Sequence, residues 1–186
     1  VLNILNKIKD KFIDSHYENG FLLGLEAENF YLSLEPGAQL EVSTKPFDSL
    51  DEARSAFEKF YEIIAPALKE EAAKLLCVPV LSEDLVDSIK IIPKKRYEYM
   101  DRYFEKTGKF GKYMMRATAS AQVSVDYSSE RDFVRKYRAA YIMSPFLALL
   151  SADSLASDGN YLKRVGIWRG VDPCRTAIVP DLFSDD

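Results

Sequence analysis

Cysteine, histidine and long apolar runs are scarce in this sequence, and each shortage excludes a class of protein. The 186 residues include two cysteines, Cys77 and Cys174, and a single histidine, His16. These are too few for a disulfide framework or for a cysteine–histidine metal cluster. No apolar run approaches the ~20 residues that a membrane helix requires, so we expect no membrane partner. No signal peptide is visible, and free thiols predict a reducing, cytoplasmic location.

Clusters of basic residues are also scarce along the sequence. The formal net charge is −4, and Lys94–Arg96 is the one basic block that stands out. Because phosphate binding needs a basic stripe, we exclude nucleic acid as a partner. Apolar material, by contrast, is plentiful: 47% of the residues are hydrophobic, including eleven Phe and eleven Tyr. This composition predicts a single folded domain over residues 1–186.

Polar and apolar residues alternate on both sides of Pro36-Gly37-Ala38. With a turn of residues 36–38, residues of the same kind face each other: Glu35 with Gln39, Leu34 with Leu40, and Ser33 with Glu41. A two-residue turn would instead pair Leu34 with Gln39. Because strand register follows face matching, the sequence predicts a hairpin with a three-residue loop. Glu35, Gln39 and Glu41 then share one face.

Helical spacing and capping residues predict most of the other elements. Apolar residues at helical spacing indicate a helix over 1–12. Ser49-Leu50-Asp51-Glu52 is a capping box, which opens a long helix. Further helices are predicted over 96–104 and 130–150, and short strands over 21–25 and 163–168.

A second alternating segment, Thr118–Tyr127, predicts a strand. Its polar face carries Thr118, Ser120, Gln122, Ser124 and Asp126, whereas its other face is small and apolar. We expect this strand to join the same sheet as the hairpin. Strands and long helices alternate irregularly, and at least one pair of strands forms a tight hairpin. The pattern predicts an α+β fold with a largely antiparallel sheet and with helices on one face.

The polar faces of these two segments are the candidate sites. Solvated sheet faces would look similar, but Glu35, Glu41 and Asp126 are poor strand formers. Gln39 and Gln122 add neutral oxygen atoms. Carboxylate and amide oxygens on adjacent strands suit Mg²⁺, a hard cation that is often shared with substrate phosphates. The sequence therefore offers candidate magnesium ligands on these faces.

Five segments carry motifs that become specific when taken together. They are residues 33–43 (SLEPGAQLEVS), 92–100 (IPKKRYEYM), 114–115 with 122–130 (MM and QVSVDYSSE), 135–139 (RKYRA), and 167–168 with 172–176 (IW and DPCRT). In the same order they resemble SLEPGGQxELS, MPKGRYxIM, MM…QVNLDFSSE, RKFRAG and IW…DxDRTG. These are motifs of the glutamate–cysteine ligases of the plant and alphaproteobacterial type.

This resemblance implies a glutamine-synthetase-like carboxylate–amine ligase fold and an enzyme that uses ATP and Mg²⁺. ATP would phosphorylate the γ-carboxylate of glutamate, and the amine of cysteine would attack the acyl phosphate, which is the first step of glutathione synthesis. By analogy, the metal ligands are Glu35, Glu41 and Gln122, and the nucleotide contacts are Gln39, Gln122 and Thr118. Positioning and charge neutralisation carry such chemistry, in agreement with the lack of a Ser-His or Cys-His pair.

Two arginines are the candidate catalytic residues under this resemblance. Arg175 presents a rigid fork that suits a carboxylate or phosphate, and Arg138 is the second candidate. A surface salt bridge is the alternative for Arg175. Arg138 and its neighbour Arg135 could instead pair with acids on their own helix. For three further residues, a substrate contact and a role in the core are the two alternatives. They are Thr118, Met115 and Trp168.

Departures from the motifs keep other functions open. Ala38, Ser124 and Ala177 replace motif residues and could alter the amine acceptor. Glu26-Ala27-Glu28 spells the E-x-E from which the family takes further acidic ligands, but we interpret it as a turn. The alternatives are a γ-glutamyl ligase for another amine and a non-catalytic domain that binds nucleotide or glutamate.

The start of the chain also bears on these functions. The chain starts at Val1 without an initiator methionine, so we expect a central piece of a longer catalytic domain. The piece alone could be inactive whatever the longer protein does. The sequence leaves the oligomeric state open.

Overall fold

The computed structural model describes residues 1–152, 162–177, 179 and 183. The chain separates into two compact units. The first consists of Val1–Cys77 with Asp87–Arg102, and the second of Val78–Val86 with Tyr103–Asp186. Cys77 and Cys174 are both free, as expected, and the side chains of both are exposed.

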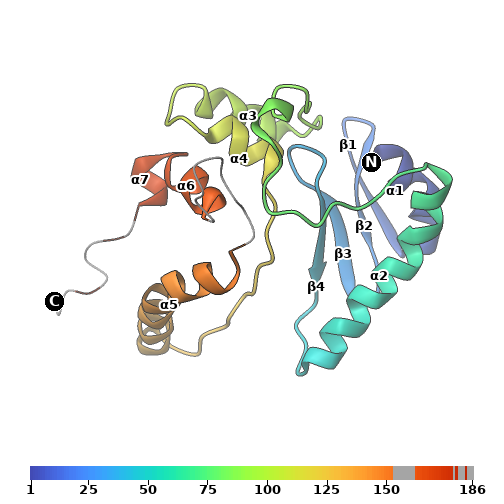
Figure 1. The fold of residues 1–186 in the computed structure, drawn as a ribbon. Helices are drawn as coiled ribbons and strands as arrows, with labels where there is room; N and C mark the ends of the chain where they lie inside the picture. Colours follow the sequence, from blue (N-terminus) through green and yellow to red (C-terminus); the bar gives the residue numbers. More distant parts are fainter. Residues whose placement is uncertain (153–161, 178, 180–182, 184–186) are drawn as a thin grey trace. The chain divides into compact units, whose positions relative to one another are not determined.

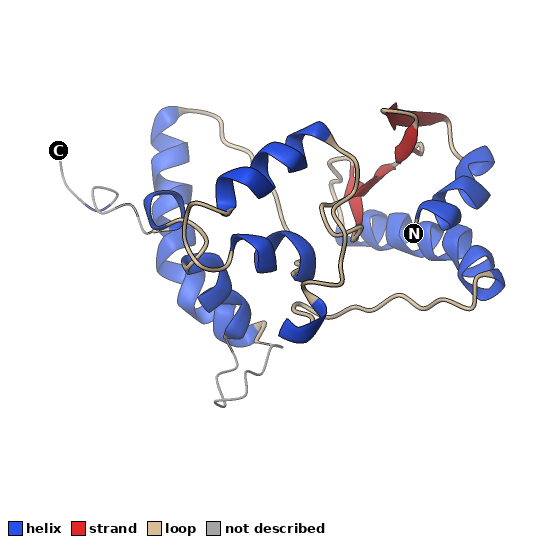
Figure 2. Cartoon of the chain, turned by 90° about the horizontal axis from the view of Figure 1, so that it is seen from above, coloured by secondary structure: helices blue, strands red, loops and turns tan. Residues whose placement is uncertain are grey.

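The first unit contains a four-stranded antiparallel sheet with the strand order β1-β2-β3-β4 (Figure 1). Figure 2 shows the strands in red, viewed from above. Its strands are β1 Asp14–Glu18, β2 Phe21–Glu26, β3 Phe30–Leu34 and β4 Leu40–Thr44. The prediction of an α+β fold with an antiparallel sheet is therefore confirmed. Glu26 is the last residue of β2, and Ala27 and Glu28 lie in the turn that leads into β3. The interpretation as a turn therefore holds for Ala27 and Glu28 and is wrong for Glu26.

Two helices pack against each other and against this sheet, namely α1 Leu2–Ile8 and α2 Leu50–Glu70. The short helix η1 Lys9–Lys11 continues α1 toward β1. Every second residue of β3 is buried, so that one face of the strand enters the core. The largest fully buried side chains of this unit are aliphatic: Leu5, Ile8, Leu23, Leu25, Leu32, Leu34 and Ile64. Each such side chain stabilises the fold by about 1.5–3 kcal/mol relative to an exposed one.

The β3–β4 hairpin has the predicted register. Leu34 pairs with Leu40 and Ser33 pairs with Glu41, and the loop between them is closed by Glu35 and Gln39. The Glu35 amide donates to the Gln39 carbonyl over 2.9 Å, and the Ala38 amide donates to the Glu35 carbonyl over 2.8 Å. Pairs two residues apart lie on the same face of a hairpin. Glu35, Gln39 and Glu41 therefore share a face, as predicted.

The predicted helices also form, and α2 and α5 have their capping residues in place. Ser49 and Glu52 form a complete capping box at the start of α2. The helix α3 Lys95–Phe104 follows Pro93, and α5 Glu130–Leu150 begins after Ser129, whose side chain accepts from the Asp132 amide. No helix in the part of the chain that the structure describes is long and apolar enough to cross a membrane.

The second unit is built from short helices and α5. Besides α5 it contains η2 Glu83–Leu85, α4 Gly111–Ala117, α6 Lys163–Arg169 and α7 Pro173–Thr176. Its core lies where α4 contacts η2 and α6. The buried apolar side chains there include Met114, Met115, Ala117, Ile167 and Val171. Met115 thus has the core role that was the alternative to a substrate contact.

Two strand predictions are wrong, and both fall in this unit. Residues 119–127 form no strand, and Thr118 makes only an isolated bridge with Val80. The alternation is real, but its apolar face is exposed, with Val123 88% exposed. A strand forms only where a neighbouring strand takes up its backbone hydrogen bonds. Lys163–Trp168 was predicted as a strand and instead forms helix α6, because a short apolar run does not distinguish the two states.

The turn at Ala38 gives a first testable prediction. Ala38 has a φ of 62°, a conformation that disfavours residues with a Cβ atom. We expect Ala38→Gly to stabilise the protein by about 0.5–1 kcal/mol. The matched control is Ala53→Gly inside α2, which should destabilise by about 1 kcal/mol. Denaturant unfolding of the two variants checks this, and a destabilising Ala38→Gly would contradict the turn geometry.

Candidate functional site

Two carboxylates lie on the same face of the β3–β4 hairpin, next to the start of α3. The hydroxyl of Tyr97 donates to Glu35 Oε1 over 3.0 Å. Glu41 is two pairs along the ladder on the same face, and its Oε1 accepts from the Ser43 hydroxyl over 3.1 Å. Both glutamates are partly exposed, so that a ligand can reach them.

Two carboxylates and two nearby basic residues set the electrostatics of this face. Burial raises the pKa of Glu35, and the neighbouring Glu41 carboxylate raises it further. The hydrogen bond from Tyr97 and the charges of Lys94 and Arg96 act in the opposite direction. Burial, and then the Glu35 carboxylate, raise the pKa of the Tyr97 hydroxyl, which therefore stays protonated as a donor. A divalent cation at this face would relieve the repulsion between the two carboxylates.

Gln39 was predicted as a nucleotide contact, and in the structure its side chain forms a hydrogen bond within the hairpin loop. Gln39 Oε1 accepts from the Gly37 amide over 2.7 Å, so that it holds the loop between the two carboxylates. A loop amide that would otherwise face the turn unpaired is thereby satisfied. The Gln39 side chain consequently stabilises the geometry in which Glu35 and Glu41 share a face.

The donor set fits Mg²⁺ if further ligands come from elsewhere. Within the described residues, no group of three or more His, Cys, Asp or Glu side chains could hold a metal ion. The hairpin itself offers two carboxylates. Mg²⁺ is usually bound through one or two carboxylates, with water and substrate phosphates completing its shell. Glu35 and Glu41 match that pattern in number and in chemistry.

The remaining predicted site residues belong to the second unit. Thr118 is buried, and its hydroxyl donates to the Met114 carbonyl over 2.8 Å. Thr118 therefore has the core role that was the alternative to a substrate contact. Gln122 is exposed within the non-strand segment 119–127. Gln122 and the hairpin belong to different units, so a site that they share stays a prediction.

Arg175 lies within α7, and its side chain is largely exposed to solvent. Arg175 Nε lies 3.4 Å from Asp172 Oδ2, and the guanidinium stacks 4.9 Å from the centroid of the Tyr103 ring. The Arg175 side chain nevertheless remains 72% exposed. A guanidinium that is fixed at one edge and free at the other can still bind an anion. The salt bridge considered as the alternative thus exists and leaves the predicted role open.

Asp172 and Tyr103 were missed at the sequence level. Asp172 is buried, accepts from the Tyr103 hydroxyl over 2.7 Å and caps α7 by accepting from the Cys174 amide over 3.0 Å. The hydrogen bond to Asp172 raises the pKa of Tyr103. The Asp-Pro pair at residues 172–173 is a helix-start signal that could have revealed the cap.

Arg164 is a further arginine that sequence reasoning missed. Its Nε donates to the Ala119 carbonyl over 2.9 Å, and its guanidinium lies 5.3 Å from the centroid of the Trp168 ring. Burial lowers the pKa of Arg164. The wrong strand prediction over 163–168 concealed this contact, because the helix is what places Arg164 and Trp168 side by side.

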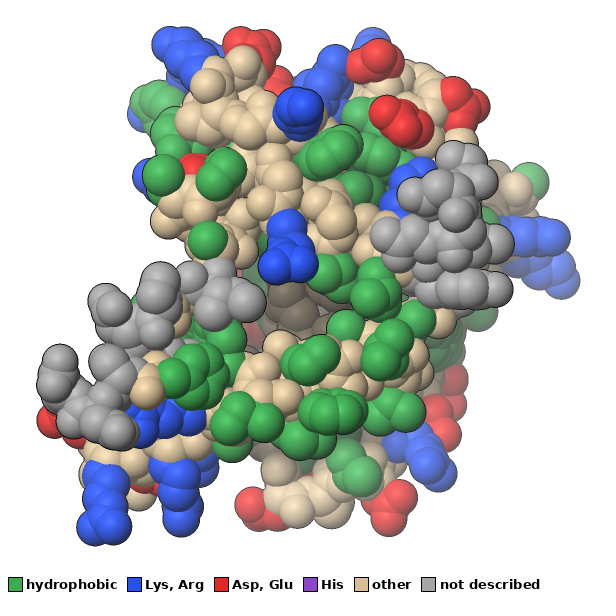
Figure 3. Space-filling model, turned by 60° about the vertical axis from the view of Figure 1, so that its left-hand side comes forward, with side chains coloured by type: hydrophobic (Ala, Val, Ile, Leu, Met, Phe, Trp, Pro, Cys, Tyr) green, Lys and Arg blue, Asp and Glu red, His purple; other side chains and the backbone are tan. Residues whose placement is uncertain are grey.

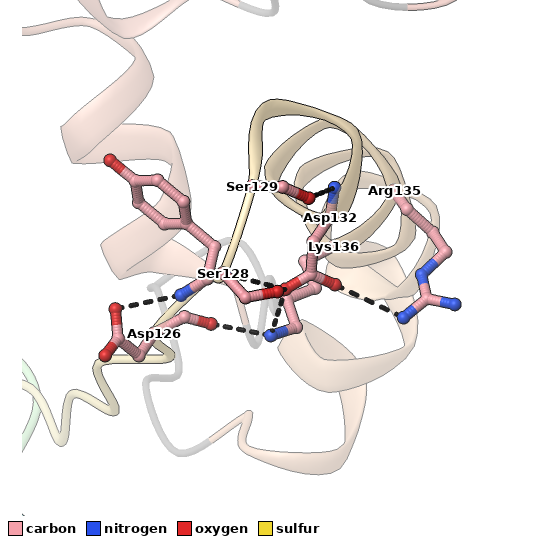
Figure 4. Close-up of polar contacts among 7 residues, drawn as sticks. Asp126, Ser128, Ser129, Asp132, Arg135 and Lys136 are labelled. Carbon is pink, nitrogen blue, oxygen red and sulfur yellow. Dashed lines mark hydrogen bonds and ion pairs between the residues drawn. The ribbon is translucent and has the colours of Figure 1, made fainter.

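Helix α5 begins with a compact polar cluster (Figure 4). Asp132 accepts from the Ser128 amide and forms ion pairs with Arg135 over 3.2 Å and Lys136 over 2.8 Å. Lys136 also donates to the Asp126 carbonyl over 2.7 Å, so that the chain before the helix is held as well. Arg135 thus pairs with an acid on its own helix, which was the alternative to a substrate role.

Arg138 lies one turn further along α5 than Arg135 and is partly exposed in a shallow groove of this helix. Hydrophobic side chains are exposed on the molecular surface beside charged ones (Figure 3), and α5 contributes several of them. These are Phe133, Tyr137, Ile142, Met143, Phe146, Leu147, Leu149 and Leu150. The anion-binding role of Arg138 stays a prediction.

The polar cluster at the start of α5 predicts that the stability of this helix depends on pH. Lys136, then the Ser128 amide, lower the pKa of Asp132 from 3.8 to about 2. Because the folded-state pKa lies below the unfolded one, the cluster stabilises α5 fully above pH 4 and loses this effect as the pH falls toward 2. Carboxyl ¹³C NMR titration should show this pKa directly. Lys136→Met should return it toward 3.8.

The control for that titration is Lys59→Met, which removes the partner of Glu62 from an exposed pair on α2. It should leave the Asp132 titration unchanged. An Asp132 pKa that is already close to 3.8 in the unaltered protein would contradict the ion-pair geometry.

Comparison with known proteins gives a consistent result over the whole chain. The family model described as "Glutamate-cysteine ligase family 2(GCS2)" matches residues 7–186. The chain is 32% identical over 190 residues to "Glutamate--cysteine ligase, chloroplastic" of Medicago truncatula. It is 31% identical to "Glutamate--cysteine ligase A, chloroplastic" of Oryza sativa subsp. japonica and 31% identical to "Glutamate--cysteine ligase, chloroplastic" of Arabidopsis thaliana. All of this chain is covered, but only 37%, 39% and 36% of these relatives.

One expectation from the sequence is contradicted by these relatives. Their names place these relatives in the chloroplast and not in the cytoplasm, which contradicts the predicted location. Free thiols indicated a reducing setting, but more than one compartment is reducing. Targeting to an organelle depends on a leader segment and not on the composition of the folded domain.

Proposed function

This chain belongs to glutamate-cysteine ligase family 2, and we propose that the protein containing it joins the γ-carboxylate of glutamate to the amine of cysteine with consumption of ATP. This reaction is the first step of glutathione synthesis. The observation that carries the proposal in the structure is the pair of carboxylates, Glu35 and Glu41, on one face of a hairpin whose register is fixed.

The chain spans little more than a third of the relatives that it matches. We therefore propose that residues 1–186 are a central part of one longer catalytic domain, with a glutamine-synthetase-like fold. The antiparallel sheet and the helices packed on it support this fold class. Residues outside this chain would complete the site, since two carboxylates leave most of a metal shell unfilled.

In this proposal, Glu35 and Glu41 would hold Mg²⁺ through carboxylate oxygens, and Gln122 stays a predicted third ligand. A metal ion held there would supply neutralisation of phosphate charge during phosphoryl transfer. Gln39 keeps the hairpin loop in shape, and Thr118 stays a predicted nucleotide contact. Arg175 and Arg138 bind anionic groups of the substrates, for which the exposed edge of the Arg175 guanidinium is suited.

A matched pair of variants in the full-length protein tests the proposal. Glu41→Gln keeps the shape of the side chain and removes its charge, so we expect at least a ~100-fold loss of ATP-dependent γ-glutamylcysteine formation with little change in stability. Glu26→Gln, at the exposed end of β2, is the control and should retain activity. The assay measures ADP and γ-glutamylcysteine in parallel.

Equal activity in the two variants would refute the role of the hairpin. A full-length protein that releases ADP with glutamate and an amine other than cysteine would keep the ligase class and change the acceptor. No ADP release with any amine would favour a non-catalytic binding domain.

A further inference from the structure

Tyr97 is a buried residue of α3 whose hydroxyl reaches the candidate metal site. The residue is 2% exposed, and its hydroxyl donates to Glu35 Oε1 over 3.0 Å. Nothing in the proposed reaction uses Tyr97 as a substrate contact. A buried tyrosine hydroxyl needs a polar partner, and here that partner is one of the two carboxylates assigned to the metal.

The segment that leads into α3 is fastened to the hairpin at the loop itself. The Ile92 amide donates to the Pro36 carbonyl over 2.9 Å, directly after Glu35. The Lys95 amide donates to Glu18 Oε1 over 2.7 Å, which ties the first turn of α3 to β1. The position of Tyr97 relative to Glu35 is therefore fixed by hydrogen bonds from the backbone amides of Ile92 and Lys95, on either side of Pro93.

Two cations flank the Tyr97 ring and fix its orientation. Lys94 Nζ lies 4.9 Å from the ring centroid, and the Arg96 guanidinium lies 5.9 Å from it. Cations at such distances from a ring are attracted to its π face. The ring is thus held by its burial, by its neighbours and by its hydroxyl.

We propose that Tyr97 is a positioning residue that holds the Glu35 carboxylate in the orientation required to bind Mg²⁺, an inference that rests on the proposed function. A carboxylate offers two oxygens and about four lone-pair sites, so one hydrogen bond leaves room for a metal. A neutral hydroxyl orients the group without neutralising the charge that attracts the cation. Donors of this kind orient the ligands of many metal sites.

A double-mutant cycle on the full-length protein tests this inference. Mn²⁺ replaces Mg²⁺ in the presence of ATP, and its binding is followed by electron paramagnetic resonance. The four proteins are the unaltered one, Tyr97→Phe, Glu35→Gln and the double variant. Tyr97→Phe removes only the hydroxyl and keeps the buried ring. Tyr99→Phe, on the same helix and exposed, is the control.

We expect Tyr97→Phe to weaken Mn²⁺ binding by about 10-fold or more, and Tyr99→Phe to leave it unchanged. In the Glu35→Gln background, Tyr97→Phe should add little, because it acts through Glu35. Thermal unfolding of each variant reports stability separately. A role confined to packing would lower stability without coupling to Glu35.

The outcomes separate this inference from the proposed function. If Glu35→Gln weakens Mn²⁺ binding and Tyr97→Phe does not, the positioning role is wrong and the metal site stands. The positioning role is also wrong if Tyr97→Phe weakens binding equally in both backgrounds. If Glu35→Gln itself leaves Mn²⁺ binding unchanged, the metal site is wrong, and the role of Tyr97 is lost with it.

Discussion

The register of the β3–β4 hairpin determines which side chains of the first unit lie together at the candidate site. Leu34 and Leu40 face each other across the ladder, and this places Glu35, Gln39 and Glu41 together on one face. A slip of one residue would move the carboxylates to the opposite face. The register holds because Leu34 is fully buried and because the Gln39 side chain closes the loop on the Gly37 amide.

The candidate site contains features that destabilise the folded protein. Two carboxylates on one half-buried face repel each other, and burial already disfavours the charge of Glu35. Ala38 adds backbone strain of about 1 kcal/mol in the same loop. The compensation comes from neighbours: the Tyr97 hydroxyl, the charges of Lys94 and Arg96, and the aliphatic core beneath the hairpin. Such local conflicts are expected at functional sites and are tolerated where the surrounding structure supports them.

Local signals explain which parts of the fold could be predicted from sequence. The hairpin register and the helices that start at Ser49 and Ser129 depend on neighbouring residues, and they form as predicted. Residues 119–127 alternate as a strand would, but alternation does not supply a pairing partner. The segment 163–168 is too short and apolar to distinguish strand from helix. The contacts Tyr97–Glu35 and Tyr103–Asp172 join residues 62 and 69 positions apart, which no single-sequence pattern reveals. The roles of Gln122, Thr118, Arg138 and Arg175 stay predictions for the same reason.

The proposed function depends on the claim that a divalent metal binds at the Glu35–Glu41 face together with ATP. Methyl NMR of the full-length protein, labelled at leucine and valine, tests it most directly when Mn²⁺ replaces Mg²⁺. Paramagnetic broadening should be strongest for Leu34, Leu40 and Val42, which adjoin the two carboxylates, and much weaker for Leu50, beyond the far end of β4. Broadening that is as strong at Leu50 as at Leu40 would place the metal elsewhere and contradict a metal site on the hairpin.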